Sequence, residues 1–264
     1  AADCFTAVSE MTAEEARLGL GEPVDIVTPN ALGDAFPDPT LATLDARRKA
    51  RARLLELAYF TTGTIYDPDT TRIVLTSGRY EFANKGIDIF IEALDALRKA
   101  PPGARTLAFM LFPTAHNGPR RSILAAARGE PTGERFVSTH DVVNEGSDPV
   151  LQRLAELGLS NAPEDAVHAV FIPIYLDGRD ALVPESYYHL LAGADFTAFP
   201  SLYEPWGYTP LESIGYAIPT MSSDLAGFAL WAQQQGTPDQ TGVWVLQRRG
   251  RSREQAVIDL IGQT

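Results

Sequence analysis

The chain has 264 residues, of which 45% are hydrophobic and 21% charged, and this ordinary globular composition leaves room for one large α/β core or two small ones. Its net charge of −12 argues against nonspecific nucleic-acid binding, which depends on Lys and Arg to neutralise phosphates, so a phosphorylated substrate would need a few well-placed cations. No apolar run of about 18 residues predicts a membrane span, and the single cysteine, Cys4, excludes an intramolecular disulfide and fits a reducing compartment.

The first seventy residues predict short elements joined by connectors. Residues 4–9 and 24–28 are expected to form strands, and residues 12–20 a helix with Thr12 as its N-cap. An Ala-, Arg- and Leu-rich segment predicts a longer helix over residues 41–59.

From residue 71 onward, strand-like and helix-like segments alternate. The predicted strands are residues 72–77, 106–112, 167–174, 196–199, 219–222 and 243–246. Helices are expected near residues 87–99, 149–157, 186–192, 210–216 and 252–261. This alternation predicts a parallel sheet with helices on both faces, a Rossmann-like α/β fold. Residues 118–146 are polar and Gly/Arg-rich, and predict mainly loop with one short helix near residues 122–128.

Several common site motifs are missing or have an ordinary structural explanation. Gly19-Leu20-Gly21 follows a predicted helix and lacks the third glycine of a dinucleotide-binding turn, and no P-loop motif is present. Asp67-Pro68-Asp69 has the composition of a solvated turn. The four histidines lack metal-ligand spacing, and His168 lies inside a predicted strand, where a packed side chain is expected. We therefore expect neither a metal site nor a cofactor.

The first segment with the character of a site is residues 78–86, between a strand and a helix. It contains Arg79 and Lys85. Two cations beside a helix N-terminus suit a diphosphate, because Arg offers a forked donor, Lys a point charge, and the helix start free N–H groups. A surface loop with two solvated cations explains the spacing equally well.

The second such segment is residues 200–212, again between a strand and a helix. Glu204 precedes Gly207, which allows close backbone approach, and Thr209 is a plausible N-cap. Glu212 falls in the first helical turn, where a carboxylate also favours the helix dipole. That dipole effect does not explain why Glu204 or an exposed Trp206 occurs in the loop. The arrangement is therefore suited to a sugar bound above the loop.

At these residues the chain resembles the glycogen synthases of glycosyltransferase family 3. The similar segments, which occur in family order through essentially the whole chain, are FTAVSEMTAEEA, DIVTPNA, GRYEFANKGIDIFIEAL, SDPVLQRLAELGL, SLYEPWGYTPLES and PTMSSDLAGF. The resemblance implies two Rossmann-like domains facing a cleft, the GT-B architecture. It also implies a retaining enzyme that moves glucose from UDP-glucose to the non-reducing end of glycogen through an α-1,4 linkage.

The resemblance assigns a role to each matching position. Arg79 and Lys85 would hold the donor diphosphate, without a metal ion, and Glu204 would orient the transferred glucose. The ring of Tyr187 would stack on uracil, and Glu212 would bind the ribose. The backbone of three consecutive residues would meet sugar hydroxyls and phosphate: Gly207, Tyr208 and Thr209.

The resemblance also implies that the chain is a fragment. Residues 1–32 would be the last part of the N-terminal domain, residues 33–70 a connector with a helix, and residues 71–264 the nucleotide-sugar-binding domain, truncated at its C-terminal end. A fragment lacking half the cleft is expected to be inactive alone. The whole protein would be cytoplasmic, and a homo-oligomer is compatible with the resemblance.

Two other functions fit parts of the sequence. Another GT-B enzyme could use ADP-glucose or make a disaccharide, although the Glu-Pro-Trp-Gly-Tyr-Thr-Pro loop at residues 204–210 favours UDP-glucose. A non-catalytic sugar-nucleotide-binding protein is the second alternative, and the intact acidic and basic residues of the two loops argue against it.

Overall fold

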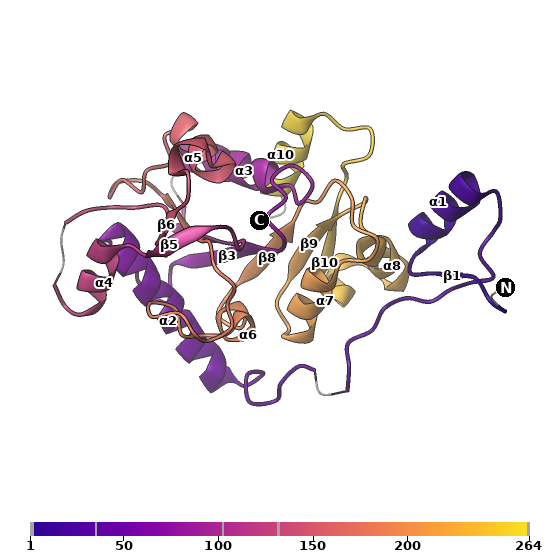
Figure 1. Ribbon diagram of the computed structural model, residues 1–264, viewed down its shortest axis with the longest axis horizontal. Helices are drawn as coiled ribbons and strands as arrows, with labels where there is room; N and C mark the ends of the chain where they lie inside the picture. The colour runs from indigo at the N-terminus through magenta and orange to yellow at the C-terminus, as the bar shows by residue number, and fades with distance from the viewer. Residues whose placement is uncertain (1–2, 35, 102, 131–132, 263–264) are drawn as a thin grey trace.

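The computed structural model describes residues 3–34, 36–101, 103–130 and 133–262. At its centre is a six-stranded parallel sheet with the order β10-β9-β8-β3-β4-β7 (Figure 1). Its strands are β3 (Arg72–Ser77), β4 (Thr106–Leu111), β7 (Val167–Ile172), β8 (Phe196–Phe199), β9 (Thr220–Ser223) and β10 (Val243–Leu246). The predicted parallel sheet is confirmed, and β3 has the predicted bounds.

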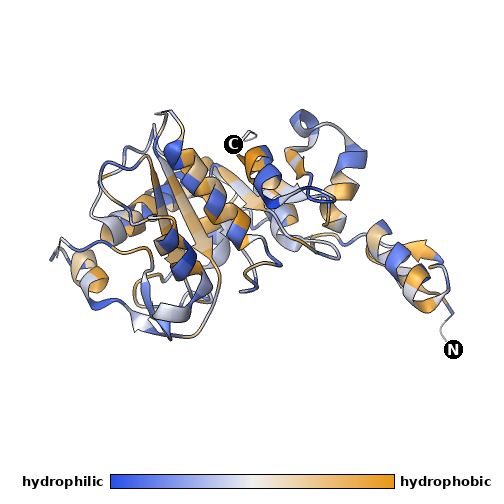
Figure 2. Cartoon of the chain, turned by 90° about the horizontal axis from the view of Figure 1, so that it is seen from above, coloured by the Kyte–Doolittle hydropathy of each residue, from blue (hydrophilic) through white to orange (hydrophobic). Residues whose placement is uncertain are grey.

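Helices cover both faces of this sheet (Figure 1). One face packs against α3 (Ile87–Lys99), α5 (Pro149–Glu156) and α10 (Arg253–Ile261). The other packs against α2 (Leu44–Thr62), α4 (Arg121–Ala127) and α6 (Tyr187–Leu191). Successive side chains of a strand point to opposite faces, so Val74 joins the first core cluster and Ile73 the second. The apolar strands between the helices explain the continuous hydrophobic runs in the sequence (Figure 2).

Three further helices pack against β8, β9 and β10, the strands that come last in the chain. They are α7 (Tyr208–Gly215), α8 (Gly227–Gln235) and α9 (Pro238–Thr241). Helix α7 packs against β8 and β9, and α8 against β9 and β10. A third core cluster joins Trp206, Phe228, Ala232 and Val243. The sequence predicted α7 but neither α8 nor α9.

A small N-terminal unit lies at one end of the molecule (Figure 1). Two short strands, β1 (Thr6–Ala7) and β2 (Ile26–Val27), pair in parallel and flank α1 (Glu10–Leu20). The predicted cap of this helix is wrong. Ser9 is the N-cap, and Thr12 occupies the third helical position, from which its hydroxyl accepts a hydrogen bond from the Ser9 N–H. This reciprocal capping box starts the helix two residues before the predicted start.

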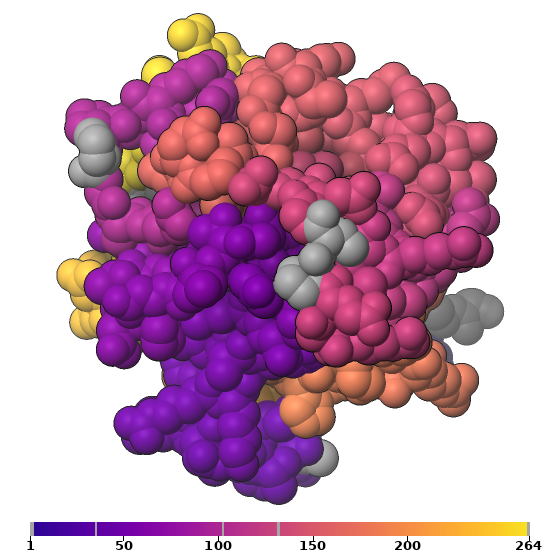
Figure 3. Space-filling model, turned by 90° about the vertical axis from the view of Figure 1, so that its left-hand side faces the viewer, coloured from indigo at the N-terminus to yellow at the C-terminus, as the bar shows by residue number. Residues whose placement is uncertain are grey.

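The segment predicted mainly as loop contains most of a two-stranded antiparallel sheet. Strands β5 (His116–Pro119) and β6 (His140–Val142) pair antiparallel, and η1 (Glu145–Ser147) follows. Both strands are too short to show an alternating pattern. The predicted short helix is present as α4, whose surface adjoins that of α2 on the side shown in Figure 3. Within the described ranges, no helix is long and apolar enough to cross a membrane.

Candidate functional site

The sheet has a topological switch point between β3 and β8. From β3 the chain proceeds outward to β4 and β7, and it then returns to β8, on the other side of β3, before β9 and β10. Loops that leave neighbouring strands at such a point run in opposite directions and leave a crevice for ligands. The two loops here are residues 78–86 after β3 and residues 200–207 after β8. These are the two segments that the sequence singled out.

The two loops are in direct contact. The Leu202 N–H donates to the Asn84 carbonyl over 2.8 Å. Close by, the Lys85 ammonium donates to the Glu204 carboxylate in an ion pair whose side chains are only 12% and 20% exposed. The structure therefore brings together two of the three residues predicted to act on the donor.

Gly86 makes this contact sterically feasible. Its φ is +68°, and a Cβ at this position would lie 1.9 Å from the Pro200 carbonyl oxygen. Only glycine combines a left-handed backbone with so close an approach. Because Gly86 is also the N-cap of α3, the first loop ends, and the helix begins, against the start of the second loop.

A cavity of about 350 Å³ opens beside these loops at the carboxyl edge of the sheet. Four of the predicted site residues line it: Arg79, Tyr187, Thr209 and Glu212. The rest of its lining is mostly apolar and comes from the ends of β3, β4 and β7, with Ser77, Gly78, Leu111, Pro113, Ile174, Tyr175 and Leu176. The cavity therefore combines an apolar lining with the charged groups of Arg79 and Glu212.

Arg79 and Lys85 occupy different environments. The Arg79 side chain is 74% exposed, and its guanidinium lies 3.3 Å from the Glu81 carboxylate. An exposed pair of this kind contributes little stability, so Arg79 is free to reorient toward an anion in the cavity. Lys85 is nearly buried and already paired.

Tyr187 and Glu212 are each held by a neighbouring hydroxyl. The Tyr187 hydroxyl lies 2.9 Å from Ser77 Oγ, which fixes its ring at the cavity wall. Tyr188 donates its hydroxyl to Glu212 Oε1 over 2.8 Å. Burial raises the pKa of the Glu212 carboxyl, and the hydrogen bond from Tyr188 opposes that rise. The carboxylate keeps a second oxygen with which it can accept hydrogen bonds from a ligand.

The start of α7 differs from its predicted form. Gly207, at φ +109°, is the N-cap, and Thr209 lies within the first turn, so its predicted capping role is wrong. Among the described residues, no side chain caps this helix, and its first N–H groups therefore remain available to an anion. Tyr208 is 47% exposed, whereas Trp206 is buried at 4% exposure, which corrects its predicted exposure. Trp206 packs edge-on against Phe228 instead.

The residues predicted to have ordinary structural roles have them. Asp67 and Asp69 lie at an exposed turn in which Asp67 accepts from the Asp69 N–H. His168 is fully buried in β7, between the Tyr66 hydroxyl and the Ala162 carbonyl. Among the described side chains, no group of three or more His, Cys, Asp or Glu could hold a metal ion.

A cavity of similar size lies elsewhere in the fold. About 390 Å³ in volume, it lies between α2, α6 and the preceding connector, and it contains none of the predicted site residues. Size alone therefore does not distinguish the two cavities; of the two, the smaller is the one lined by predicted site residues.

Three residues that support or line the site were not predicted from the sequence. Ser77 and Tyr188 hold Tyr187 and Glu212, and Leu176 forms part of the cavity wall. Ser77 could have been found as the polar last residue of an apolar strand. Nothing in the local sequence marks the other two.

The sequence of the chain matches a known protein family over nearly its whole length. The family described as Glycogen synthase matches residues 1–126 and 119–263. A curated relative, glycogen [starch] synthase of Caenorhabditis elegans, is 30% identical over 322 residues, which cover 98% of this chain and 48% of that protein. The chain thus spans less than half the length of the curated relatives it matches.

Solved structures show the same fold at lower identity. WaaG, a glycosyltransferase involved in lipopolysaccharide biosynthesis, matches with a TM-score of 0.55 and 18% identity over 97% of this chain and 52% of its own. HepE of Anabaena, solved in complex with UDP-glucose, matches with a TM-score of 0.53, 18% identity and the same two coverages. These matches confirm the predicted α/β fold, that of GT-B glycosyltransferases.

Proposed function

Because the chain belongs to the glycogen synthase family, we propose that it is the nucleotide-sugar-binding half of a retaining glucosyltransferase. The whole enzyme would move glucose from UDP-glucose to the non-reducing end of an α-1,4-glucan. In this proposal residues 1–32 belong to the end of the N-terminal domain, residues 33–70 form the connector, and residues 71–264 bind the donor. A cytoplasmic location is part of the same proposal.

One observation supports this assignment above the others. The ion pair of Lys85 and Glu204 lies beside a cavity lined by Arg79, Tyr187 and Glu212, at the switch point of a parallel sheet. The groups that this proposal assigns to the diphosphate, the base and the ribose therefore lie near one another, which supports it. A UDP-glucose complex of HepE, which shares the fold, is consistent with a donor of this class.

In the proposed reaction, charge develops on the leaving diphosphate and on the anomeric carbon. Lys85, Arg79 and the free N–H groups at the start of α7 would stabilise the UDP as it leaves, and no metal ion is required. Glu204 would orient the glucose hydroxyls and stabilise the positive charge at the anomeric carbon. It would not act as a nucleophile, and the new bond would form on the face that the nucleotide leaves.

Calorimetric titration with UDP tests the donor site. The 264-residue chain should bind UDP, and Arg79→Ala should weaken that binding by at least about tenfold, since a charge-assisted phosphate contact contributes about 1.5–3 kcal/mol. Arg72→Ala is the matched control, because Arg72 is an exposed arginine at the opposite end of β3. Equal UDP affinity of the wild-type and Arg79→Ala chains would contradict the assigned phosphate site.

A further inference from the structure

The loop between β7 and α6 forms one wall of the cavity, and we call residues 175–186 the wall loop. Leu176 lines the cavity and, through its carbonyl, accepts the N–H of Tyr187 over 3.1 Å. Asp177 and Ser186 form an antiparallel bridge next to this contact. The two ends of the loop are therefore joined into a stem, and that stem presents Tyr187 to the cavity.

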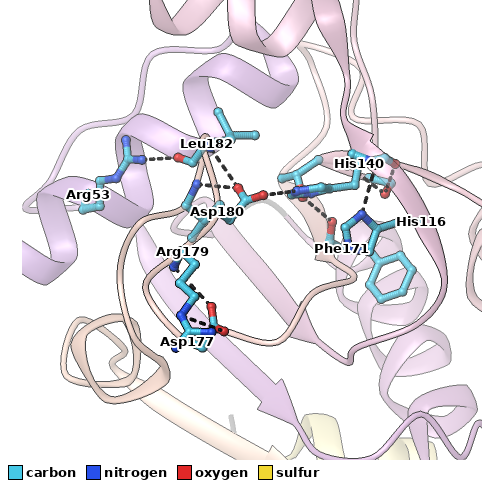
Figure 4. Close-up of polar contacts among 12 residues, drawn as sticks. Arg53, His116, His140, Phe171, Asp177, Arg179, Asp180 and Leu182 are labelled. Atoms are coloured by element: carbon cyan, nitrogen blue, oxygen red, sulfur yellow. Dashed lines mark hydrogen bonds and ion pairs between the residues drawn. The ribbon is translucent and has the colours of Figure 1, made fainter.

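The tip of the wall loop is organised around Asp180. One carboxylate oxygen accepts the backbone N–H groups of Leu182 and Val183, each over 2.8 Å. The other lies 3.1 Å from Nε2 of His140, a fully buried residue of β6 (Figure 4). Because a carboxylate only accepts hydrogen bonds, Nε2–H donates to Asp180, and Nδ1 then accepts from the Thr139 hydroxyl over 2.8 Å.

Arg53 of α2 also contacts the tip of the loop, and we call His140, Asp180 and Arg53 the anchors. The Arg53 guanidinium donates to the Leu182 carbonyl (Figure 4) and, over 2.8 Å, to the Glu185 carboxylate. The Arg53 side chain is only 20% exposed. The tip is thus fixed between β6 on one side and α2 on the other.

Thr139, His140 and Asp180 have the order of a catalytic triad, but not its accessibility. The Thr139 hydroxyl is fully buried and also lies 3.3 Å from the Phe171 carbonyl. No substrate can reach it there. The dyad of His140 and Asp180 therefore fixes the position of a loop, and it does not activate a nucleophile.

We propose that His140, Asp180 and Arg53 are positioning residues for the nucleobase end of the cavity. By fixing the tip of the wall loop, they hold the stem that presents Tyr187 and Leu176 to the flat face of a pyrimidine. This inference rests on the proposed function, which assigns uracil to Tyr187. The phosphate-binding cations lie on a different loop, so loss of the anchors affects the base and leaves the diphosphate contacts intact.

The test uses the 264-residue chain with Asp180→Ala, Arg53→Met and, as control, Arg179→Ala. Arg179 belongs to the same loop, but its side chain is 87% exposed. Calorimetry is performed with UDP and, separately, with inorganic pyrophosphate. Each anchor variant should bind UDP about tenfold more weakly, because the loosened wall loop must then be ordered when the base binds, and should bind pyrophosphate as the wild type does. The control should match the wild type with both ligands.

Hydrogen exchange provides a readout that does not depend on ligand binding. The Tyr187 amide should exchange faster in both anchor variants, while the central amides of β4 keep their protection. His140→Gln, whose side-chain amide can still donate to Asp180, should restore most of the protection that His140→Leu loses. Equal loss of UDP and pyrophosphate affinity, or unchanged exchange at Tyr187, would overturn the inference. A wild-type chain that binds no UDP would instead refute the proposed function, and the exchange data alone would then decide whether the anchors act.

Discussion

Lys85 and Glu204 lie 119 positions apart in the sequence, yet their side chains form an ion pair across the crevice between two loops. The pair exists because β3 and β8 are neighbours in the sheet, although β4 and β7 come between them in the chain. In the proposed site Lys85 faces both a carboxylate of the protein and a phosphate of the donor. The affinity for the donor therefore depends on how strongly the Glu204 carboxylate competes with the phosphate for the Lys85 ammonium.

Glu204→Gln should strengthen UDP binding to this chain. The substitution removes a negative charge close to the diphosphate and frees Lys85, and a unit charge at about 4 Å contributes about 1 kcal/mol even in water. Calorimetry should show about fivefold tighter binding. Glu81→Gln, which removes the partner of the exposed Arg79, should change the affinity by less than about twofold. Weaker UDP binding by Glu204→Gln would show that Glu204 does not compete for Lys85.

Glu212→Ala should remove the ability of the site to recognise the ribose. If Glu212 accepts hydrogen bonds from the ribose hydroxyls, the wild-type chain should prefer UDP over 2′-deoxy-UDP by about tenfold, the usual contribution of one hydrogen bond to a charged group. Glu212→Ala should bind the two nucleotides with nearly equal affinity. A preference that survives the substitution would place the ribose elsewhere.

Gly86→Ala should destabilise the fold far more than Gly63→Ala. Both glycines have nearly the same φ, +68° and +67°, so alanine costs about 1 kcal/mol of backbone strain at either position. Only at position 86 would the new Cβ clash with a backbone oxygen, that of Pro200. Urea unfolding should give a loss of about 1 kcal/mol for Gly63→Ala and about 3 kcal/mol for Gly86→Ala. Equal losses of unfolding free energy in the two variants would mean that the contact between the two loops does not contribute to stability.

The stability of the chain should fall in mild acid, in part because of His168. Burial lowers the pKa of His168, although its hydrogen bond to the Ala162 carbonyl opposes the change. Below pH about 6.5 the unfolded chain therefore takes up a proton that the folded chain does not, and stability decreases until the lowered pKa is reached. His168→Asn should show a shallower loss between about pH 6.5 and 5 than the wild type. His189→Asn, at an exposed position, serves as the control for the same substitution outside the core.

Much of the fold could be predicted because the strands of a buried parallel sheet are continuous apolar runs. The predicted strand over residues 72–77 has the bounds of β3, and α5 begins at the predicted residue 149. Helix α8 was missed because Ala226 provides no side-chain cap and the segment shows little amphipathic periodicity. The burial of Trp206 depends on Phe228, which lies 22 positions further along the chain, and no local pattern shows that contact.

The two loops of the candidate site could be predicted from the sequence, but their contact with each other could not. Residues 78–86 and 200–212 each had the right chemistry, and the rule that ligands bind beyond the carboxyl ends of strands placed them on one edge of the sheet. Their direct contact depends on the strand order, which the sequence does not show. The assignment of Tyr187 to the base came from the family resemblance, and its hydrogen bond to Ser77 appears only in three dimensions.

The most direct test is a crystal structure of the chain soaked with UDP-glucose. We expect density for the diphosphate between Arg79, Lys85 and the first N–H groups of α7, with uracil against the Tyr187 ring and the glucose near Glu204. Density for the nucleotide in the other cavity, between α2 and α6, would contradict the proposed donor site, as would a donor bound with its phosphates away from Lys85.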